Sequence, residues 1–365
     1  MSKVGDYFFE FPASRGMQGS TATYMITAPA RALTRILASD NHGSTLERSQ
    51  REINQARVKK FYQYLVNAYQ NKEPFIIPPL VGNCDADIEF EEFGNTNVGV
   101  ARFPMDAVIK LFDGQHRAAG LAEFCRTYGE PISIPLMLTH NLPLKARQQF
   151  FSDINNNVSK PSAAINMAYD GRNDVAQGMV SFLSQHDTFS EVTDFEHNVV
   201  PAKSKLWVSF KALSDATAKF ANAGSKPLEM GDIESIWEAW LALTQIEAIR
   251  HGTSQADYKR DYIQFHAVMI NAFGYAVQRL MADHSIVDIV QMIDELASNA
   301  GSTEMEDFFL ISRWSGICVN AEKDRPTIIA SVPAQKSAAE RLVKVILAKA
   351  LRNSYDNADA LNALA

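Results

Sequence analysis

The chain has 365 residues, more than one compact core usually holds, and its composition of 46% hydrophobic and 21% charged residues is globular. This composition excludes intrinsic disorder, collagen-like sequence and a simple coiled coil. The sequence has no long apolar run, and its N-terminus has no basic segment followed by an apolar one, so we expect neither a membrane span nor a secretion signal. The three cysteines, Cys84, Cys125 and Cys318, fit neither a disulfide framework nor a zinc motif, which favours a cytoplasmic protein.

The net charge of −7 argues against a general nucleic-acid coat, because phosphate binding depends on lysine and arginine. Two local basic segments remain compatible with it. The first contains only Glu52 as an acid and comprises Arg48, Arg51, Arg57, Lys59 and Lys60. The second contains only Glu340 and comprises Lys336, Arg341, Lys344, Lys349 and Arg352. Each segment is either a solvated helix face or a surface for DNA.

The first half of the chain alternates between helical and strand-like patterns, which predicts an α/β layer. Residues 46–70 have helical apolar spacing, and Glu73-Pro74 stops this predicted helix. Residues 75–81 have a strand-like pattern that Pro78-Pro79 interrupts. The remaining predicted elements are a hairpin over 88–100, a strand over 107–112, a helix ending near Gly129, a strand over 132–138 and a helix starting after Pro143.

The second half of the chain has a different character, with helical periodicity throughout. The predicted helices span 206–220, 233–249, 262–281, 286–296 and 338–351. We therefore expect two domains, an α/β domain over 1–175 and a mostly α-helical domain over 176–365. The long apolar faces of the second domain suit packing or self-association, so we expect a homo-oligomer.

The densest polar signal is the run Asp113-Gly114-Gln115-His116-Arg117, which lies between the predicted strand and the following helix. Glycine permits a tight turn and lets a ligand approach the backbone, while the helix start offers free N–H groups to an anion. His116 and Arg117 fall in the first helical turn, where the dipole disfavours cations, and a bound phosphate would offset that cost.

A purely structural interpretation of this run is equally open. Asp113 would then cap the helix, and Arg117 would pair with a surface carboxylate. The run is not a P-loop, because no glycine-rich stretch ending in Gly-Lys-Ser/Thr occurs in the chain.

The run Asp113–Arg117 resembles the signature of the DGQHR-domain proteins, and its surroundings resemble the DndB family, which is associated with DNA phosphorothioate modification. Further similar segments occur in the family's order over roughly residues 8–175. They are Phe11-Pro12, Arg15-Gly16, 48–57 (RSQREINQAR), Pro104–Ala107, Gln148–Phe151, Asp153–Asn155 and Lys160–Ser162, followed by Ser204–Leu206 in the helical half.

The resemblance implies a ParB/sulfiredoxin-like domain, whose superfamily binds nucleoside triphosphates at a glycine-containing turn. It implies a nucleotide site of Gly114, Gln115, His116, Arg117 and Asn155, with ATP and Mg²⁺ as cofactors. Asp113 would be the metal ligand, and Asp113 and His116 the catalytic residues if ATP is hydrolysed. Gln115 stands where sulfiredoxin has its nucleophilic cysteine, which excludes sulfinic acid reduction at this motif.

Two functions follow from the resemblance. The first is a DNA-binding repressor of the modification operon with ATP-modulated affinity, which would contact DNA through Arg51, Arg57, Lys59 and Lys60. The second is an ATPase or nuclease-like accessory enzyme, similar to the DpdB proteins of 7-deazaguanine insertion. The sequence contains no clear helix-turn-helix, so the basic segment carries the DNA prediction.

Overall fold

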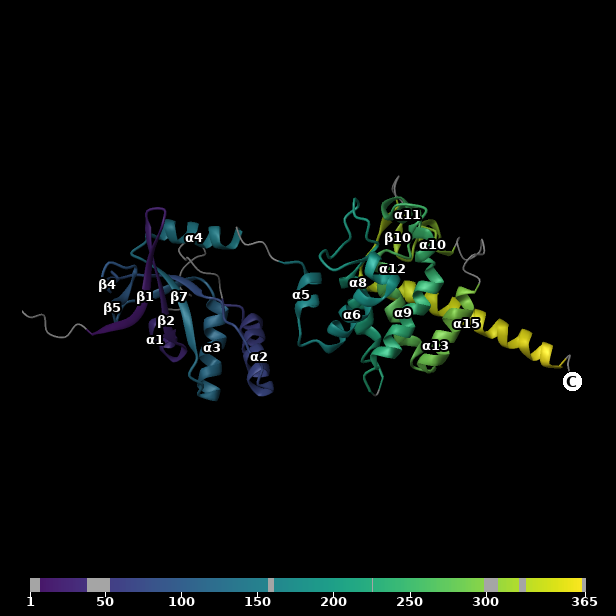
Figure 1. The fold of residues 1–365 in the computed structure, drawn as a ribbon, viewed down its shortest axis with the longest axis horizontal. Helices are drawn as coiled ribbons and strands as arrows, with labels where there is room; N and C mark the ends of the chain where they lie inside the picture. Colours follow the sequence, from purple (N-terminus) through teal and green to yellow (C-terminus); the bar gives the residue numbers. More distant parts are fainter. Residues whose placement is uncertain are drawn as a thin grey trace, which may run out of the picture. The chain divides into compact units, whose positions relative to one another are not determined.

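The computed structural model describes residues 7–37, 53–156, 161–224, 226–298, 308–321 and 326–362. The chain divides into two compact units, residues 1–159 and residues 160–365 (Figure 1). The first unit contains a seven-stranded sheet with helices, and the second is mostly helical, so the chain is mixed α/β as expected. Residues 160–175, which the sequence analysis placed in the first domain, cluster with the second unit.

The sheet of the first unit has the strand order β4-β5-β1-β2-β7-β3-β6. Its strands are β1 (Phe8–Gln18), β2 (Thr21–Pro29), β3 (Leu80–Cys84), β4 (Glu89–Glu92), β5 (Val98–Pro104), β6 (Ile109–Asp113) and β7 (Ser133–His140). β3 and β7 pair in parallel, and the other neighbouring strands are antiparallel. The first two strands of the chain therefore lie in the middle of the sheet.

In the described part of the first unit, the helices that accompany the sheet are α1 (Leu33–Ile36), α2 (Gln55–Asn71), α3 (Gln115–Tyr128) and α4 (Leu144–Asn156), with a 3₁₀ turn, η1 (Ala30–Ala32), before α1. Leu65 of α2 and Leu121 of α3 are fully buried in one cluster with Ile109 of β6. Successive side chains of a strand point to opposite faces. Phe112 accordingly leaves this cluster and contacts Phe150 of α4 edge to face, at 6.1 Å between ring centroids.

The structure corrects two predicted boundaries in the first unit. The helix predicted over 46–70 corresponds to α2, which begins at Gln55 because Asn54 is extended and caps it, while residues 46–52 lie outside the described residues. The strand predicted over 75–81 is confined to Leu80–Cys84, since neither Pro78 nor Pro79 has an N–H to donate. The hairpin of β4 and β5 is confirmed, with Gly94 at a φ of 64°.

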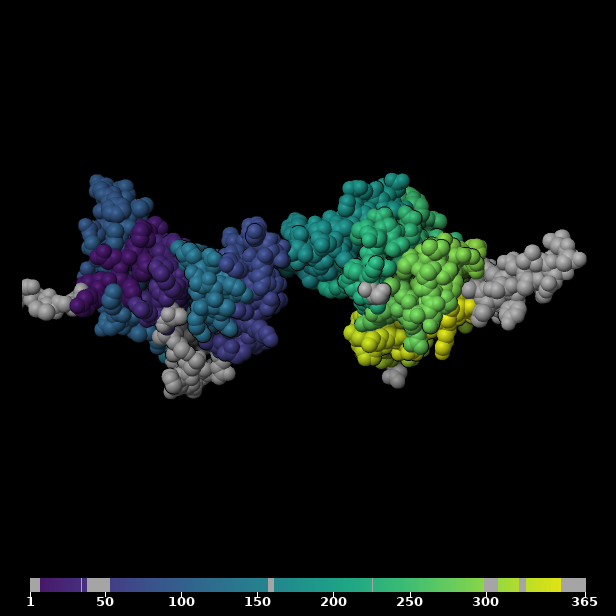
Figure 2. All heavy atoms as spheres, turned by 90° about the horizontal axis from the view of Figure 1, so that it is seen from below, coloured from purple at the N-terminus to yellow at the C-terminus, as the bar shows by residue number. Residues whose placement is uncertain are grey.

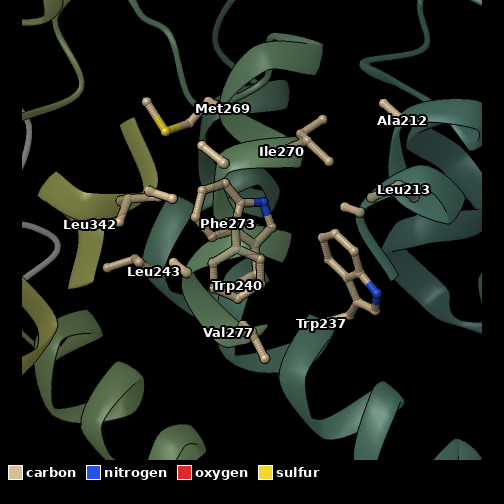
Figure 3. Packing of buried hydrophobic residues seen from close by; sticks show 14 of the residues in the cluster. Ala212, Leu213, Trp237, Trp240, Leu243, Met269, Ile270, Phe273, Val277 and Leu342 are labelled. Carbon is tan, nitrogen blue, oxygen red and sulfur yellow. The ribbon is translucent and has the colours of Figure 1, made fainter. Parts of the chain in front are cut away.

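The second unit is built on a buried aromatic cluster (Figure 3). Trp240 stacks on Phe273 at 4.4 Å between centroids, and Trp237 donates from Nε1 to Thr217 Oγ1 over 2.9 Å. The α-helices of the unit are α5 (Ala163–Tyr169), α6 (Asp174–Gln185), α7 (Asp187–Val192), α8 (Phe210–Phe220), α9 (Met230–Thr244), α10 (Ile246–Arg250), α11 (Gln255–Asp261), α12 (Ala267–Leu280), α13 (Ile286–Ala297) and α15 (Val332–Asn362). Shorter elements are β8 (Thr193–Asp194), β9 (Val208–Ser209), η3 (Ile311–Trp314), β10 (Val319–Asn320) and β11 (Thr327–Ile328).

The long helices of the second unit occur where the sequence pattern predicted them, with three corrections. The helix predicted over 206–220 begins at Phe210, after the strand β9, and the helix predicted over 262–281 begins at Ala267. The helix predicted over 233–249 is two helices. Gln245 has a left-handed φ of 51° and separates α9 from α10. In the described part of the chain, none of the helices has both the length and the apolar character needed to cross a membrane.

Candidate nucleotide and DNA site

The run Asp113–Arg117 forms the predicted strand-to-helix turn between β6 and α3. Gly114 has a φ of 98°, and a Cβ at this position would lie 2.4 Å from Leu80 Cδ2. The Gly114 carbonyl accepts the first helical hydrogen bond of α3, from the Ala118 N–H over 2.8 Å. Only glycine avoids both the backbone strain and the overlap at this point, so the turn geometry itself requires Gly114.

Arg117 is held by the protein's own oxygens. Its Nη2 donates to Asp113 Oδ2 over 2.5 Å, and its Nη1 donates to the Pro78 carbonyl over 2.6 Å. The side chain is only 19% exposed. This geometry contains the ion pair of the purely structural interpretation, but the capping residue differs from it: Gly114, not Asp113, is the N-cap of α3. Arg117 therefore ties the turn to the segment that precedes β3.

His116 connects the starts of two helices. Its Nε2 accepts a hydrogen bond from the Asn54 N–H over 3.0 Å, so this nitrogen carries no proton in the contact. The Asn54 side chain in turn accepts from the N–H groups of Ala56 and Arg57, which caps α2. Asn54 was not predicted as part of the site, although an asparagine directly before a helix is a common capping signal.

The helices α2 and α3 run in the same direction, since Asn54 meets His116 and Val58 meets Gly120 one turn later. They lie side by side in Figure 1 and at the surface in Figure 2. Their N-terminal ends therefore lie together, and among the described residues no side chain caps the first turn of α3. Two positive dipole ends at one place favour an anion there.

The other two predicted nucleotide-binding residues make local hydrogen bonds. Gln115 donates from Nε2 to the Leu111 carbonyl over 3.0 Å, at the end of β6. Asn155 donates from Nδ2 to the Phe151 carbonyl over 2.7 Å and is exposed near the end of α4. Gln115 is thus part of the turn, whereas the described contacts do not bring Asn155 to it.

The predicted metal ligand Asp113 has Arg117, and not a second metal-binding side chain, as its partner among the described residues. In the described residues no group of three or more His, Cys, Asp or Glu side chains is placed to hold a metal. One oxygen of Asp113 accepts from Arg117, and the side chain is 45% exposed. Mg²⁺ commonly takes one or two carboxylates together with substrate phosphates, so a site here would need oxygens from a nucleotide.

Three of the four predicted DNA-binding residues lie on the outer face of α2. Arg57, Lys59 and Lys60 are exposed, while Val58 and Leu65 face the core. Arg51 lies outside the described residues. The sequence of α2 contains no Asp or Glu, so its three cations are not neutralised within the helix. This face is a compact basic surface beside the turn.

In the second basic segment, on α15, two of the cations pack against aromatic rings, unlike the exposed cations of α2. Arg341 lies over the Trp314 ring, with Cζ 4.6 Å from its centroid, and donates to the Arg313 carbonyl. Burial lowers the pKa of Arg341, and Lys336 lies over the Tyr275 ring. Lys344 is exposed, and nothing is described for the side chains of Lys349 and Arg352. The basic surface of α2 is the better candidate for DNA.

Comparison with known proteins agrees with the segments that surround the turn. The family model described as DndB, DNA-sulfur modification-associated, matches residues 11–305 and so extends over both units. No curated protein and no solved structure matches the chain significantly. The chain therefore belongs to the DndB family, and its function lies in DNA phosphorothioate modification systems.

Proposed function

We propose that the protein is a DNA-binding transcriptional regulator of its own modification operon and that α2 supplies the DNA contact. The observation that carries this proposal is the exposed face of α2, with Arg57, Lys59 and Lys60 and no acidic residue. Lysine and arginine that contact phosphates release condensed counterions, and this release drives most of the affinity for DNA.

The same helix face offers groups that can read bases. Lys59, Gln63 and Asn67 are spaced by four residues and so form one stripe along the exposed side of α2. The amides of Gln63 and Asn67 are joined by a hydrogen bond of 2.7 Å. Glutamine and asparagine side chains pair with adenine in the major groove, so the stripe combines phosphate contact at one end with base contact along it.

The charge distribution of the first unit supports one orientation on DNA. β4 forms the sheet edge opposite to β6 and has the sequence Glu-Phe-Glu-Glu. Arg102 and Arg15 partly neutralise it, with Arg102 bonded to Glu10 and Glu91 and Arg15 paired with Glu92. An acidic edge far from a basic helix would direct α2 toward the negative duplex.

The proposal includes a nucleotide at the start of α3, beside α2. Its phosphates would be bound by the free N–H groups of the turn, with Asp113 sharing a Mg²⁺ ion with the phosphate oxygens. Arg117 would then be a positioning residue, because its guanidinium is already bonded to Asp113 and Pro78. The strand, glycine turn and helix over 109–128 support a ParB/sulfiredoxin-like assignment for this domain, in which ATP shifts the affinity of α2 for DNA.

The test is fluorescence anisotropy of a labelled promoter fragment over a series of salt concentrations, with the full chain. The variant K59A/K60A removes two cations from α2, and K336A/K344A removes two from α15. The slope of log affinity against log salt should fall by about 1.8 for the α2 variant and stay unchanged for the α15 variant. Adding Arg57→Ala to the α2 variant should lower this slope further.

The opposite pattern would assign DNA binding to α15, and no change in either variant would reject the DNA proposal for both surfaces. ATP with Mg²⁺ should change the wild-type affinity by at least about threefold, or about 0.7 kcal/mol. Equal affinity with and without ATP would reject the nucleotide part alone.

A further inference from the structure

The second unit contains a cavity of about 320 Å³ that the family assignment does not explain. It lies between α8, α11, the start of α12 and the segment 195–207, which joins β8 to β9. The volume is in the range of small-molecule sites. Because all of its walls come from residues 198–270, the cavity belongs to the helical unit alone.

The lining of the cavity is apolar and positive. Trp207 and Phe265 meet edge to face at 5.3 Å between centroids and form an aromatic wall. Lys259, Arg260 and His266 also line the cavity, and Arg260 is paired with Asp257. Among the described residues that line it there is no Asp or Glu. Burial lowers the pKa of His266, so the cations of the wall are Lys259 and Arg260, and an anion would meet no carboxylate among the lining residues.

Lys259 is the central cation of this lining. Its amine donates to the Trp207 carbonyl, and burial lowers its pKa to about 8. An ammonium group has three N–H donors, so two remain after this bond. Gln255, one turn earlier on α11, donates to the carbonyls of Pro201 and Ala202 over 3.0 and 3.1 Å. The two side chains fix the segment that covers the cavity and thereby preserve its shape.

The start of α12 adds a second positive element. His266 is the N-cap of α12, and among the described residues no side chain bonds to the first N–H groups of this helix. His266 Nε2 is bonded to the Lys259 carbonyl at 2.8 Å, which places the helix start next to Lys259. Ala267, the first residue of α12, also lines the cavity. A helix N-terminus beside a partly buried lysine favours a negative group at this end of the cavity.

We propose that this cavity binds a small organic anion, with a flat apolar body against Trp207 and Phe265 and one carboxylate or phosphate group at Lys259 and the start of α12. The site is independent of the turn at Gly114, because it lies in the other unit.

The test uses 8-anilinonaphthalene-1-sulfonate, an aromatic anion that fluoresces in apolar surroundings, with the full chain. All four tryptophans of the chain, including Trp207, lie in the helical unit, so energy transfer from tryptophan to the dye reports binding there. We expect a saturable signal with one site. Lys259→Met should weaken it at least about tenfold, since a charge-assisted bond is lost. Ala256→Phe, which fills the cavity from α11, should abolish it.

The matched control is Lys219→Met. Lys219 is also a partly buried lysine of this unit whose pKa is lowered by burial, but it bonds to Asn271 and does not line the cavity. Dye binding should be unchanged in this variant, and Lys259→Arg should keep most of it. Equal loss in Lys219→Met and Lys259→Met would mean that the dye reports destabilisation and would overturn the proposal.

Displacement of the dye identifies the anionic group that the cavity accepts. Benzoate and phenyl phosphate present the two groups on the same ring, and benzyl alcohol is the neutral counterpart. We expect at least one of the two anions to displace the dye at concentrations where benzyl alcohol does not. Displacement by the neutral alcohol at equal concentration, or no dye binding to the wild type, would reject an anion site.

Discussion

Arg117 shows how contacts can outweigh a general electrostatic rule at the scale of one residue. A cation in the first turn of a helix is disfavoured by the dipole, so this rule alone predicts that its removal is neutral or mildly stabilising. In the structure, however, the guanidinium satisfies both Asp113 and the Pro78 carbonyl and is largely shielded from solvent. Groups that lose their partner in such a place cost free energy.

We therefore expect Arg117→Ala to lower the free energy of unfolding of the first unit by about 1–3 kcal/mol. Arg126→Ala is the control, because Arg126 is exposed in the last turn of the same helix, where its charge is favourable but worth less than about 1 kcal/mol. Thermal unfolding followed by far-ultraviolet circular dichroism measures both. A larger loss for Arg126→Ala would show that the dipole, and not the contacts, governs the turn.

Lys259 gives a pH dependence with a defined sign. Its pKa is about 8 in the folded protein because of burial, against an ordinary value of about 10.5. Below pH 8 the amine is charged in both states, and the folded state bears the full cost of burying the charge. Between about pH 8 and 10.5 the folded state has lost the proton while the unfolded state keeps it, so stability from this group rises with pH.

Urea unfolding followed by tryptophan fluorescence reports the helical unit and measures this effect. From pH 7.5 to 10.5 the wild type should gain up to about 3 kcal/mol relative to Lys259→Met. Lys344→Met, at an exposed lysine, should show no such relative change. A constant difference between wild type and Lys259→Met over this range would contradict the assignment.

At the scale of elements, the close contact between α2 and α3 depends on the small residue Gly120. A Cβ on Gly120 would lie 3.1 Å from both the Val58 carbonyl oxygen and Phe61 Cδ1. Any larger residue at this position would therefore require α2 to shift by a few tenths of an ångström. The close approach of the two helices brings Asn54 to His116 and so joins the basic helix to the turn.

Gly120→Val should lower the free energy of unfolding by about 1–3 kcal/mol, because its branched side chain overlaps α2. Ala119→Val is the matched control, since it introduces the same branched residue at the neighbouring, partly exposed position of α3. Helix propensity favours valine over glycine and alanine over valine, so a larger loss for Gly120→Val in thermal unfolding is caused by packing. Equal losses of unfolding free energy in the two variants would show that α2 can move away from α3 without loss of stability.

The sequence predicted those elements whose signals are local. The apolar strand followed by Asp113-Gly114, the hairpin at Gly94 and the helix ending at Gly129 depend on neighbouring residues and are confirmed. β1 and β2 were not predicted, because their positions are decided by pairing with β5 and β7, far away in the chain. The contacts of Arg117 with Pro78, and of His116 with Asn54, are non-local for the same reason.

At the scale of the whole molecule, the two units have separate cores that share no residue. The sequence indicated this division through the change from alternating elements to helices alone. It did not indicate the cavity, whose walls come from α8, α11, α12 and a segment without regular structure. A cavity depends on how helices of different parts of the chain pack, and periodicity within each helix contains no information about that packing.

The strand order determines in which order the strands can pair while the chain is being synthesised. β3 and β6 reach the rest of the sheet only through β7, which ends at His140. The hairpin of β1 and β2 forms from local contacts, and β5 can join it at β1 once residue 104 has been made. Before β7 is made, the only strand partners of β6 are β3 and the bridge from Leu37 to Ile109. The turn at Gly114 therefore joins the seven-stranded sheet only after β7 has paired with β2 and β3, although its residues are made before those of β7.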